Sequence, residues 1–261
     1  MLNTAHDQVP ARAAASRESR LLAVVARNTH ATDSCSSCCL KGVCLPSGIA
    51  EEDVGVFDAL TTVKRRVTRG SAVYRCSDSF EAIYAVRSGA FKNVGVSTKG
   101  EEKITGFYHP GELLGLDAIN SGRHQFNGIA LEDSEVCVIP YARLQELALR
   151  IPALQHHVFR LISRDISRDQ GLMLLLGSMT AEQRLAAFLL SLSRRYQGMG
   201  YSADRFNLRM TREDIGNYLG VTLETVSRFL SRFQRDGLIA ARQREIKIKD
   251  ADALLEIVGC W

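Results

Sequence analysis

The sequence predicts an α+β protein with an N-terminal all-β domain, a long helix and a C-terminal winged helix-turn-helix domain. Three observations lead to this fold class. The chain has 261 residues, a length more typical of two domains than of one. Short apolar stretches separated by turn residues fill the region 63–140, a pattern typical of strands. After Pro140 the apolar residues recur at spacings of three and four, which is typical of helices.

The composition is that of a soluble globular protein. Apolar residues make up 46% of the chain and charged residues 24%, and no apolar run approaches the roughly 20 residues of a membrane-spanning helix. The apolar run at residues 21–26 is too short for an export signal. We therefore expect a cytoplasmic protein, in which the seven cysteines are metal ligands or free thiols rather than disulfides.

The all-β domain follows an N-terminal arm. Residues 1–30 show little hydrophobic periodicity, so we expect this arm to be flexible. Residues 82–86, 104–108 and 134–139 are apolar segments, and Ser-Gly or Pro-Gly pairs follow the first two. Their spacing along the chain is that of strands in a barrel or a sandwich.

A long helix follows the all-β domain. Residues 141–149 are predicted to form a short helix, which ends before Pro152, and a longer periodic segment begins at that proline. Residues at spacings of three and four form a heptad-like seam along this segment, in which all positions but one are apolar and the remaining one is charged. Such a seam is either the intramolecular core face of the helix or a dimer contact. The seam residues are Leu154, Val158, Ile162, Ile166, Asp169, Met173 and Leu176.

The C-terminal segment has the element order of a winged helix. Thr211 can cap a helix with Asp214 in the capping-box position, Gly220 can make the next turn, and Thr222 can cap a second helix. Gly237 stands where that second helix would end. Besides these two helices, we predict a helix over 181–196, a short strand near 206–210 and a hairpin over 238–249.

The second of these helices carries candidate DNA-reading residues. Glu224, Ser227 and Arg228 share one face at its N-terminal end. There, Arg can bind guanine, Glu can accept from the cytosine amine, and Ser is more permissive. The alternative is a solvated face with an intrahelical Glu224–Arg228 pair. The net charge is only +4, but the Arg-rich stretch from Arg184 to Arg244 suits phosphate contacts.

Three cysteines fall within ten residues as Cys35-x2-Cys38-x5-Cys44, among small and turn-forming residues. Three ligands from one loop plus a distant fourth suit a cubane iron-sulfur cluster. Structural zinc sites more often use two separate C-x2-C pairs, and zinc remains the alternative. Spacing alone does not choose the fourth ligand. The candidates are Cys39, Cys76, Cys137 and Cys260.

Longer motifs surround these two candidate sites. They are the cysteine loop ending in Leu45-Pro46, and the segments Ile83-Tyr-Ala-Val-Arg-Ser-Gly89, Ile104-Thr-Gly-Phe107, Gly115-Leu-Asp-Ala-Ile119, Val136-Cys-Val-Ile-Pro140, Thr211 to Gly220 and Leu223-Glu-Thr-Val-Ser-Arg228. With these motifs the sequence resembles the oxygen-sensing FNR (fumarate and nitrate reduction regulator) branch of the cyclic-AMP receptor protein (Crp/Fnr) family. The resemblance covers nearly the whole chain after the arm.

The resemblance implies a jelly-roll β-barrel like that of cyclic-nucleotide-binding domains, and it gives each part of the chain a role. It implies a flexible arm (1–30), a cysteine cluster-binding loop (31–50), a β-roll sensory domain (51–150), a dimerisation helix (151–178) and a winged helix-turn-helix DNA-binding domain (179–261).

The resemblance also implies a cofactor and partners. The family's fourth ligand is the cysteine two residues before Ile-Pro, which is Cys137 here. The implied cofactor is a [4Fe-4S] cluster that favours a DNA-binding homodimer, and oxygen converts the cluster and returns the protein to monomers. The implied targets are palindromic TTGAT-type promoter sites, where Glu224 and Arg228 read the G·C pair and Ser227 a neighbouring thymine. RNA polymerase is the implied partner of the turn at 97–103.

One seam residue offers a physical basis for such a switch. The expected dimer interface consists of Ile162, Ile166, Asp169, Met173 and Leu176. Two ionised Asp169 carboxylates in a poorly solvated interface would oppose dimerisation. The dimer without the cluster should therefore be marginal. We expect cluster binding to move the helix face through Ile166, so that packing exceeds the repulsion.

A cyclic-nucleotide receptor and an enzyme are the competing function classes. A cyclic phosphate would need an Arg-Ser or Arg-Thr pair after a Gly-Glu turn; Gly111-Glu112 starts such a turn, but residues 123–130 contain no such pair. We therefore expect no cyclic nucleotide. No βαβ pattern or Gly-rich phosphate loop supports an enzyme. The histidines at 109, 124, 156 and 157 lack a partner at a metal-ligand spacing, so we expect no catalytic site.

Overall fold

The computed structural model describes residues 34–58 and 63–259. Contacts divide the chain into residues 1–32 and 33–261, so all described residues belong to the second unit. The predicted arm and Cys260 lie outside the described residues. Among residues 34–58 and 63–259, none of the helices has the combination of length and hydrophobicity that a membrane span requires.

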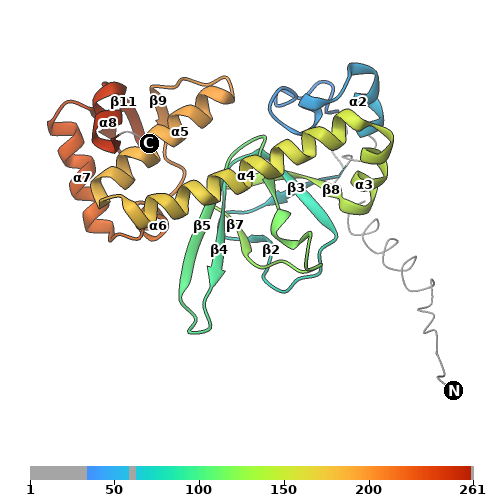
Figure 1. Ribbon diagram of the computed structural model, residues 1–261, viewed down its shortest axis with the longest axis horizontal. Helices are drawn as coiled ribbons and strands as arrows, with labels where there is room; N and C mark the ends of the chain where they lie inside the picture. The colour runs from blue at the N-terminus through green and yellow to red at the C-terminus, as the bar shows by residue number, and fades with distance from the viewer. Residues whose placement is uncertain (1–33, 59–62, 260–261) are drawn as a thin grey trace. The chain divides into compact units, whose positions relative to one another are not determined.

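Two four-stranded antiparallel sheets form the β domain (Figure 1). One sheet has the strand order β1-β8-β3-β6 and the other β2-β7-β4-β5. The predicted jelly-roll class is confirmed, as two facing sheets rather than one closed barrel. The strands are β1 (Val63–Val67), β2 (Ala72–Tyr74), β3 (Ala82–Ser88), β4 (Phe91–Val96), β5 (Glu102–Tyr108), β6 (Leu113–Leu114), β7 (Asn127–Ala130) and β8 (Ser134–Pro140).

Strand β8 lies between β1 and β3 and presents different residues on its two faces. Cys137 pairs with Ala85 of β3 and with Lys64 of β1. Because side chains alternate along a strand, Val136 and Val138 are buried on one face, whereas Cys137 and Ile139 lie on the other. That second face is the one that the cysteine loop approaches.

The helices connect these sheets to the C-terminal domain. Pro152 opens α4, since a proline suits the first turn of a helix, and α4 then runs for 27 residues. The predicted short and long helices are therefore confirmed. Two helices of eight residues each, α2 and α8, were not predicted. The helices are the 3-10 turns η1 (Leu45–Gly48) and η2 (Leu116–Ala118), and α2 (Glu51–Asp58), α3 (Tyr141–Arg150), α4 (Pro152–Ser178), α5 (Ala181–Gly198), α6 (Arg212–Leu219), α7 (Leu223–Arg235) and α8 (Ala251–Val258).

The C-terminal domain is a winged helix whose predicted caps are confirmed. Thr211 Oγ1 accepts from the backbone N–H of Asp214 at 3.0 Å, and Thr222 Oγ1 accepts from that of Thr225 at 3.2 Å. Gly220 ends α6 in the left-handed region, with φ of 67°. The wing is the three-stranded sheet of β10 (Ile239–Arg242), β11 (Glu245–Ile248) and β9 (Arg205–Asn207).

The strand predicted near 206–210 is shorter than expected. It ends at Asn207, which pairs with Glu245, the first residue of β11. One further backbone hydrogen bond follows, from the N–H of Leu208 to the carbonyl of Arg244 at 2.8 Å, just before the start of β11. Leu208 and Met210 are buried in the domain core without being part of the strand.

Candidate cluster site and DNA-reading helix

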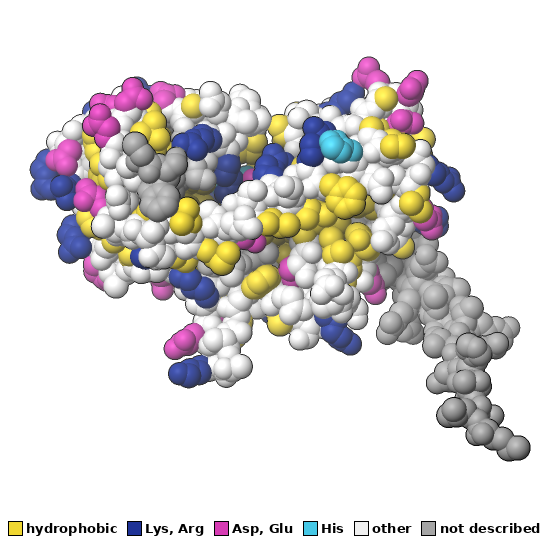
Figure 2. Space-filling model, viewed as in Figure 1, with side chains coloured by type: hydrophobic (Ala, Val, Ile, Leu, Met, Phe, Trp, Pro, Cys, Tyr) yellow, Lys and Arg dark blue, Asp and Glu magenta, His cyan; other side chains and the backbone are white. Residues whose placement is uncertain are grey.

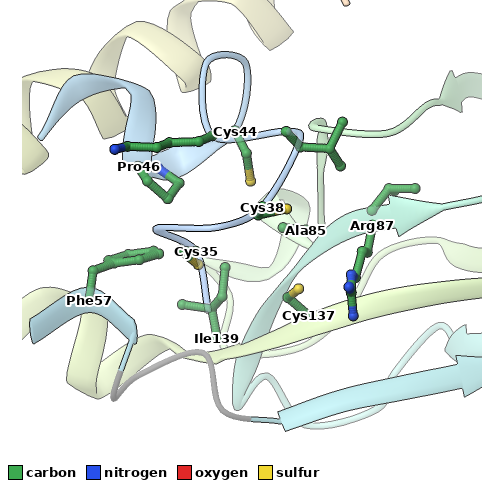
Figure 3. Close-up of a pocket in the computed structure, with 12 residues that line it drawn as sticks. Cys35, Cys38, Cys44, Pro46, Phe57, Ala85, Arg87, Cys137 and Ile139 are labelled. Carbon is green, nitrogen blue, oxygen red and sulfur yellow. The ribbon is translucent and has the colours of Figure 1, made fainter. Parts of the chain in front are cut away.

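The four cysteines assigned to the cluster line one cavity. Cys35, Cys38 and Cys44 come from the loop before α2, and Cys137 comes from β8. Figure 3 shows their sulfur atoms gathered around the space between the loop and the sheet. The remaining lining residues are Leu40, Lys41, Pro46, Phe57, Ala85, Val86, Arg87 and Ile139.

Successive tight turns bring the three loop cysteines together. The backbone N–H of Cys38 donates to the carbonyl of Cys35 at 3.3 Å, and that of Cys44 donates to the carbonyl of Leu40 at 2.9 Å. Leu40 and Leu45 are buried and hold the loop against the domain. These contacts explain why small and turn-forming residues lie between the cysteines.

Asp58, at the C-terminal end of α2, anchors the start of this loop. Its carboxylate accepts from the backbone N–H of Cys35, and from Ser36 Oγ at 3.2 Å. Sequence reasoning missed this residue. An aspartate 23 positions beyond its partner has no spacing signal that would have identified it.

The local environment makes two of the four thiols, Cys44 and Cys137, poor acids in the absence of a cationic ligand. Burial raises the pKa of Cys44 to about 12 and that of Cys137 to about 11. The other thiols of the cavity raise both pKa values further, because neighbouring thiolates repel one another. A group that binds all four as thiolates must therefore bring positive charge.

The donor set of the cavity fits an iron-sulfur cluster. In a cubane cluster each cysteine binds a different iron, so the four sulfurs need not converge on one atom. Among residues 34–58 and 63–259, no three His, Cys, Asp or Glu side chains are close enough to hold one metal ion. Lys41 and Arg87 also line the cavity, but each is already paired with a carboxylate: Lys41 Nζ lies 2.7 Å from Glu51 Oε1, and Arg87 Nη1 lies 3.0 Å from Glu135 Oε2.

The other candidates for the fourth ligand lie elsewhere. Cys39 belongs to the loop but is exposed, and Cys76 is exposed in the turn after β2. Neither lines the cavity. Of the cysteines outside the loop triad that the structure describes, Cys137 is the one brought to the site.

The seam on α4 divides into a buried part and an exposed part. Leu154 is fully buried and Val158 packs in the same cluster, so this end of the seam is intramolecular core. Further along, Ile166 is 52% and Met173 66% exposed, while Ile162 and Leu176 are half-buried. Figure 2 shows hydrophobic side chains gathered along the helix.

Asp169 lies in the exposed part of the seam. The residue is exposed in this chain, yet its carboxyl is sufficiently desolvated for its pKa to be raised, with Arg168 acting in the opposite direction. Phe159 and Leu174, 62% and 49% exposed, add apolar surface that the predicted seam did not include.

The three predicted DNA-reading residues share the accessible face of α7. Glu224 and Arg228 are exposed and Ser227 is half-buried. No ion pair within 4.0 Å joins Glu224 to Arg228 in the described part of the chain, and the Arg228 guanidinium lies 5.4 Å from the centre of the Phe229 ring. Arg212 Nη1 donates to Ser227 Oγ at 3.1 Å, a contact that sequence spacing did not reveal.

Two arginines of the predicted phosphate-binding stretch point into the protein instead. Arg184 donates to the carbonyls of Leu176 and Leu219, at 2.7 and 3.0 Å. Arg195 Nε donates to Glu112 Oε1 at 3.0 Å. The prediction that the whole Arg-rich stretch suits phosphates is therefore wrong for these two, because backbone carbonyls and a carboxylate already bind their guanidinium groups.

Glu112 connects the β domain to α5. Burial alone would raise the pKa of this carboxyl, but Arg195 and other cationic groups lower it to about 2. Its carboxylate also accepts from the backbone N–H of His109 at 2.8 Å. Burial lowers the pKa of the His109 ring to about 3, so that ring is neutral at physiological pH.

Comparison with protein families gives two matches. Residues 64–150 match the cyclic nucleotide-binding domain, and residues 183–257 match the Crp-like helix-turn-helix domain. Among solved structures, FixK2 from Bradyrhizobium japonicum has a TM-score of 0.70 at 28% identity, covering 76% of this chain and 98% of that one.

Curated relatives are similar over most of the chain. The transcriptional regulatory protein btr of Bordetella pertussis is 47% identical over 86% of this chain and 93% of its own length. The transcriptional activator protein Anr of Pseudomonas protegens is 44% identical over 88% and 94%. The fumarate and nitrate reduction regulatory protein of Escherichia coli is 41% identical over 86% and 90%. The chain therefore belongs to the Crp/Fnr family of DNA-binding transcription regulators, and it is not an enzyme.

Proposed function

We propose that this protein is an oxygen-responsive regulator that activates or represses anaerobic genes. In the proposal, a [4Fe-4S] cluster on Cys35, Cys38, Cys44 and Cys137 stabilises a homodimer that binds palindromic TTGAT-type promoter sites. The observation that carries it is that these four thiols, three from a loop and one from β8, line a single cavity. The name of the E. coli relative, a fumarate and nitrate reduction regulatory protein, supports an anaerobic role.

The protein's own residues hold and shield the cofactor in this proposal. A bound cluster would supply iron and sulfide that react with oxygen, and the protein would then return to monomers that release DNA. The four thiols bind it. Apolar Pro46 and Phe57 line the same cavity and limit the access of water, which affects the reactivity of such clusters.

The exposed part of α4 is the proposed dimer interface. An exposed apolar face on a long helix is a typical self-association surface. The lone charged member, Asp169, makes that association sensitive to small changes in helix position, since two carboxylates repel each other when they are desolvated. The proposed interface residues are Ile162, Ile166, Asp169, Met173 and Leu176.

The accessible face of α7 is the proposed base-reading surface. Glu224 and Arg228 read the G·C pair of the half-site, and Ser227 reads a neighbouring thymine. Because Arg212 donates to the Ser227 oxygen, the serine hydroxyl is free to donate its own hydrogen to thymine O4. RNA polymerase is the proposed partner of the charged turn at 97–103.

A cyclic nucleotide is not part of this proposal. A second cavity lies between the β domain and α4, at the position where such a ligand would be sought. The charged residues that line it are Asp117, Asp165 and Asp169, with no Lys or Arg among the lining residues. A carboxylate-lined cavity disfavours a phosphate, because like charges repel.

Iron and sulfide analysis of anaerobically purified protein tests the proposal. We expect about four irons and four sulfides per chain, and a brown protein with charge-transfer absorption in the visible range. Cys137→Ser should lose most of the iron, whereas the control Cys76→Ser should keep it, because Cys76 is exposed away from the cavity. Colourless protein containing zinc would overturn the proposal.

A further inference from the structure

The cysteine loop leads directly into a contact with the long helix. The 3-10 turn η1 begins immediately after Cys44, whose carbonyl accepts from the backbone N–H of Ser47 at 3.0 Å. Leu45 and Pro46 are buried, so this short turn packs against the core. Gly48, its last residue, is therefore only four positions beyond a proposed cluster ligand.

Gly48 packs against His157 of α4 without space for a side chain. An added Cβ at Gly48 would lie 2.3 Å from His157 Cβ and 2.4 Å from His157 Cγ. Such distances are much shorter than van der Waals contact distances. His157 is only 8% exposed, so its ring is enclosed by other parts of the protein. A displacement of η1 must therefore displace α4 as well.

Directional hydrogen bonds accompany this packing. Arg160 Nη2 lies 3.0 Å from His157 Nδ1, and a guanidinium can only donate, so Nδ1 is the acceptor. In the neutral ring the hydrogen is then on Nε2, which donates to Ser47 Oγ at 3.0 Å. The ring orientation is thus fixed from both sides, which makes the contact specific rather than a general apolar one.

Ile166 does not contact the cavity that the four cysteines line. The sequence led us to expect cluster binding to act through Ile166, but that residue lines the second cavity and is 52% exposed. It is not among the residues that line the cysteine cavity. A direct contact between the cysteine loop and α4 is made about one turn into the helix, at His157.

We propose that Ser47, Gly48 and His157 form a joint that transmits the state of the cysteine site to the dimer face of α4. This inference rests on the proposed function. When Cys44 binds the cluster, η1 takes a defined position, and the packed joint sets the position of α4. The helix carries this change to Asp169, twelve residues further along the same rigid element. The three residues thus position the dimer interface without touching the cluster.

Two glycine variants from the same loop test the joint. Gly48→Ala adds a methyl group where no space exists, whereas Gly42→Ala adds one where no atom lies within 4 Å. Iron per chain and sedimentation velocity are measured on the full chain without oxygen. We expect both variants to bind as much iron as the wild type, with Gly42→Ala dimerising normally and Gly48→Ala dimerising about tenfold more weakly, as typical coupling energies allow.

A second substitution keeps the inference testable if Gly48→Ala fails to fold. Ser47→Ala removes the hydrogen bond to His157 Nε2 without adding an atom, and we expect wild-type iron content with dimerisation weakened several-fold. Iron-loaded Gly48→Ala or Ser47→Ala protein that dimerises like the wild type would overturn the joint alone. Wild-type protein without iron would instead overturn the proposed function, and this inference with it.

Discussion

At the scale of single residues, Arg228 allows the most specific prediction about DNA recognition. Its side chain is exposed on α7 and forms no ion pair with Glu224 in the described structure. A bidentate contact to guanine contributes about 1–3 kcal/mol of discrimination. Arg228→Ala should therefore lose most of the preference for the G·C pair, measured by fluorescence anisotropy with base-substituted duplexes.

The control for this substitution lies on the β domain. Arg143→Ala also removes one positive charge, but Arg143 is on α3 and pairs with Glu146, so discrimination between duplexes should not change. If Arg228→Ala protein kept the wild-type preference at that base pair, the assignment of Arg228 would be wrong.

Glu112 allows a prediction about pH. Because the folded pKa of about 2 is below the usual value of 4.5, the stabilisation by this carboxylate is fully present above pH 4.5 and is lost as the pH falls toward 2. Glu112→Gln should reduce the free energy of unfolding by roughly 2–3 kcal/mol at pH 7, and by much less at pH 2. Chemical denaturation at the two pH values measures this difference.

Glu146→Gln is the matched control for Glu112→Gln. Glu146 also faces an arginine, Arg143, but both side chains are about 60% exposed, and such surface pairs contribute little stability. We expect a change below about 1 kcal/mol at either pH. An equal loss of stability for Glu112→Gln at pH 7 and pH 2 would show that the ion pair is not its cause.

At the scale of elements, α4 is the part on which the proposed switch depends. Its exposed face combines apolar residues with Asp169, whose pKa is raised by desolvation even in the isolated chain. Removing that carboxylate should favour dimerisation. We therefore expect Asp169→Ala to shift cluster-free protein from monomer toward dimer in analytical ultracentrifugation. The control is Asp252→Ala, on the exposed surface of α8, which should leave the cluster-free protein monomeric. Asp169→Ala protein that stays monomeric would contradict this role.

Much of the fold could be predicted at the element scale because the signals were local. The caps at Thr211 and Thr222, the turn at Gly220 and the helix start at Pro152 each depend on neighbouring residues, and each is present. The helix α8 was missed although Asp250 caps it, with its side chain accepting from the backbone N–H of Ala253 at 2.9 Å. A cap before only eight residues is a weak signal without the tertiary contacts that α8 makes with α5.

The candidate site was only partly predictable. The loop spacing identified Cys35, Cys38 and Cys44, but Cys137 required the family resemblance, because pairing between strands and not sequence distance brings it to the loop. Asp58 and His157 act through contacts over long separations, which no local pattern contains. The arginines at 184 and 195 were misassigned, because composition does not distinguish a surface charge from one paired inside the protein.

At the scale of the whole protein, the β domain and the DNA-binding domain are in direct contact as well as being joined by α4. Lys92 Nζ lies 2.6 Å from Asp214 Oδ1, and Asn217 binds the backbone of β5 through Ile104 N–H at 2.7 Å and the Glu102 carbonyl at 2.9 Å. These contacts hold α6 against β5. The position of the recognition helix therefore depends on the domain that carries the cysteine site.

The central claim is that the cluster on these four cysteines controls DNA binding, and a single binding titration tests it. Fluorescence anisotropy with a palindromic TTGAT duplex is measured on one anaerobic sample before and after exposure to air. We predict tight binding before exposure and its loss afterwards, with Cys137→Ser protein binding weakly in both states. Wild-type binding that is unchanged by air, or Cys137→Ser binding equal to the wild type, would contradict the account.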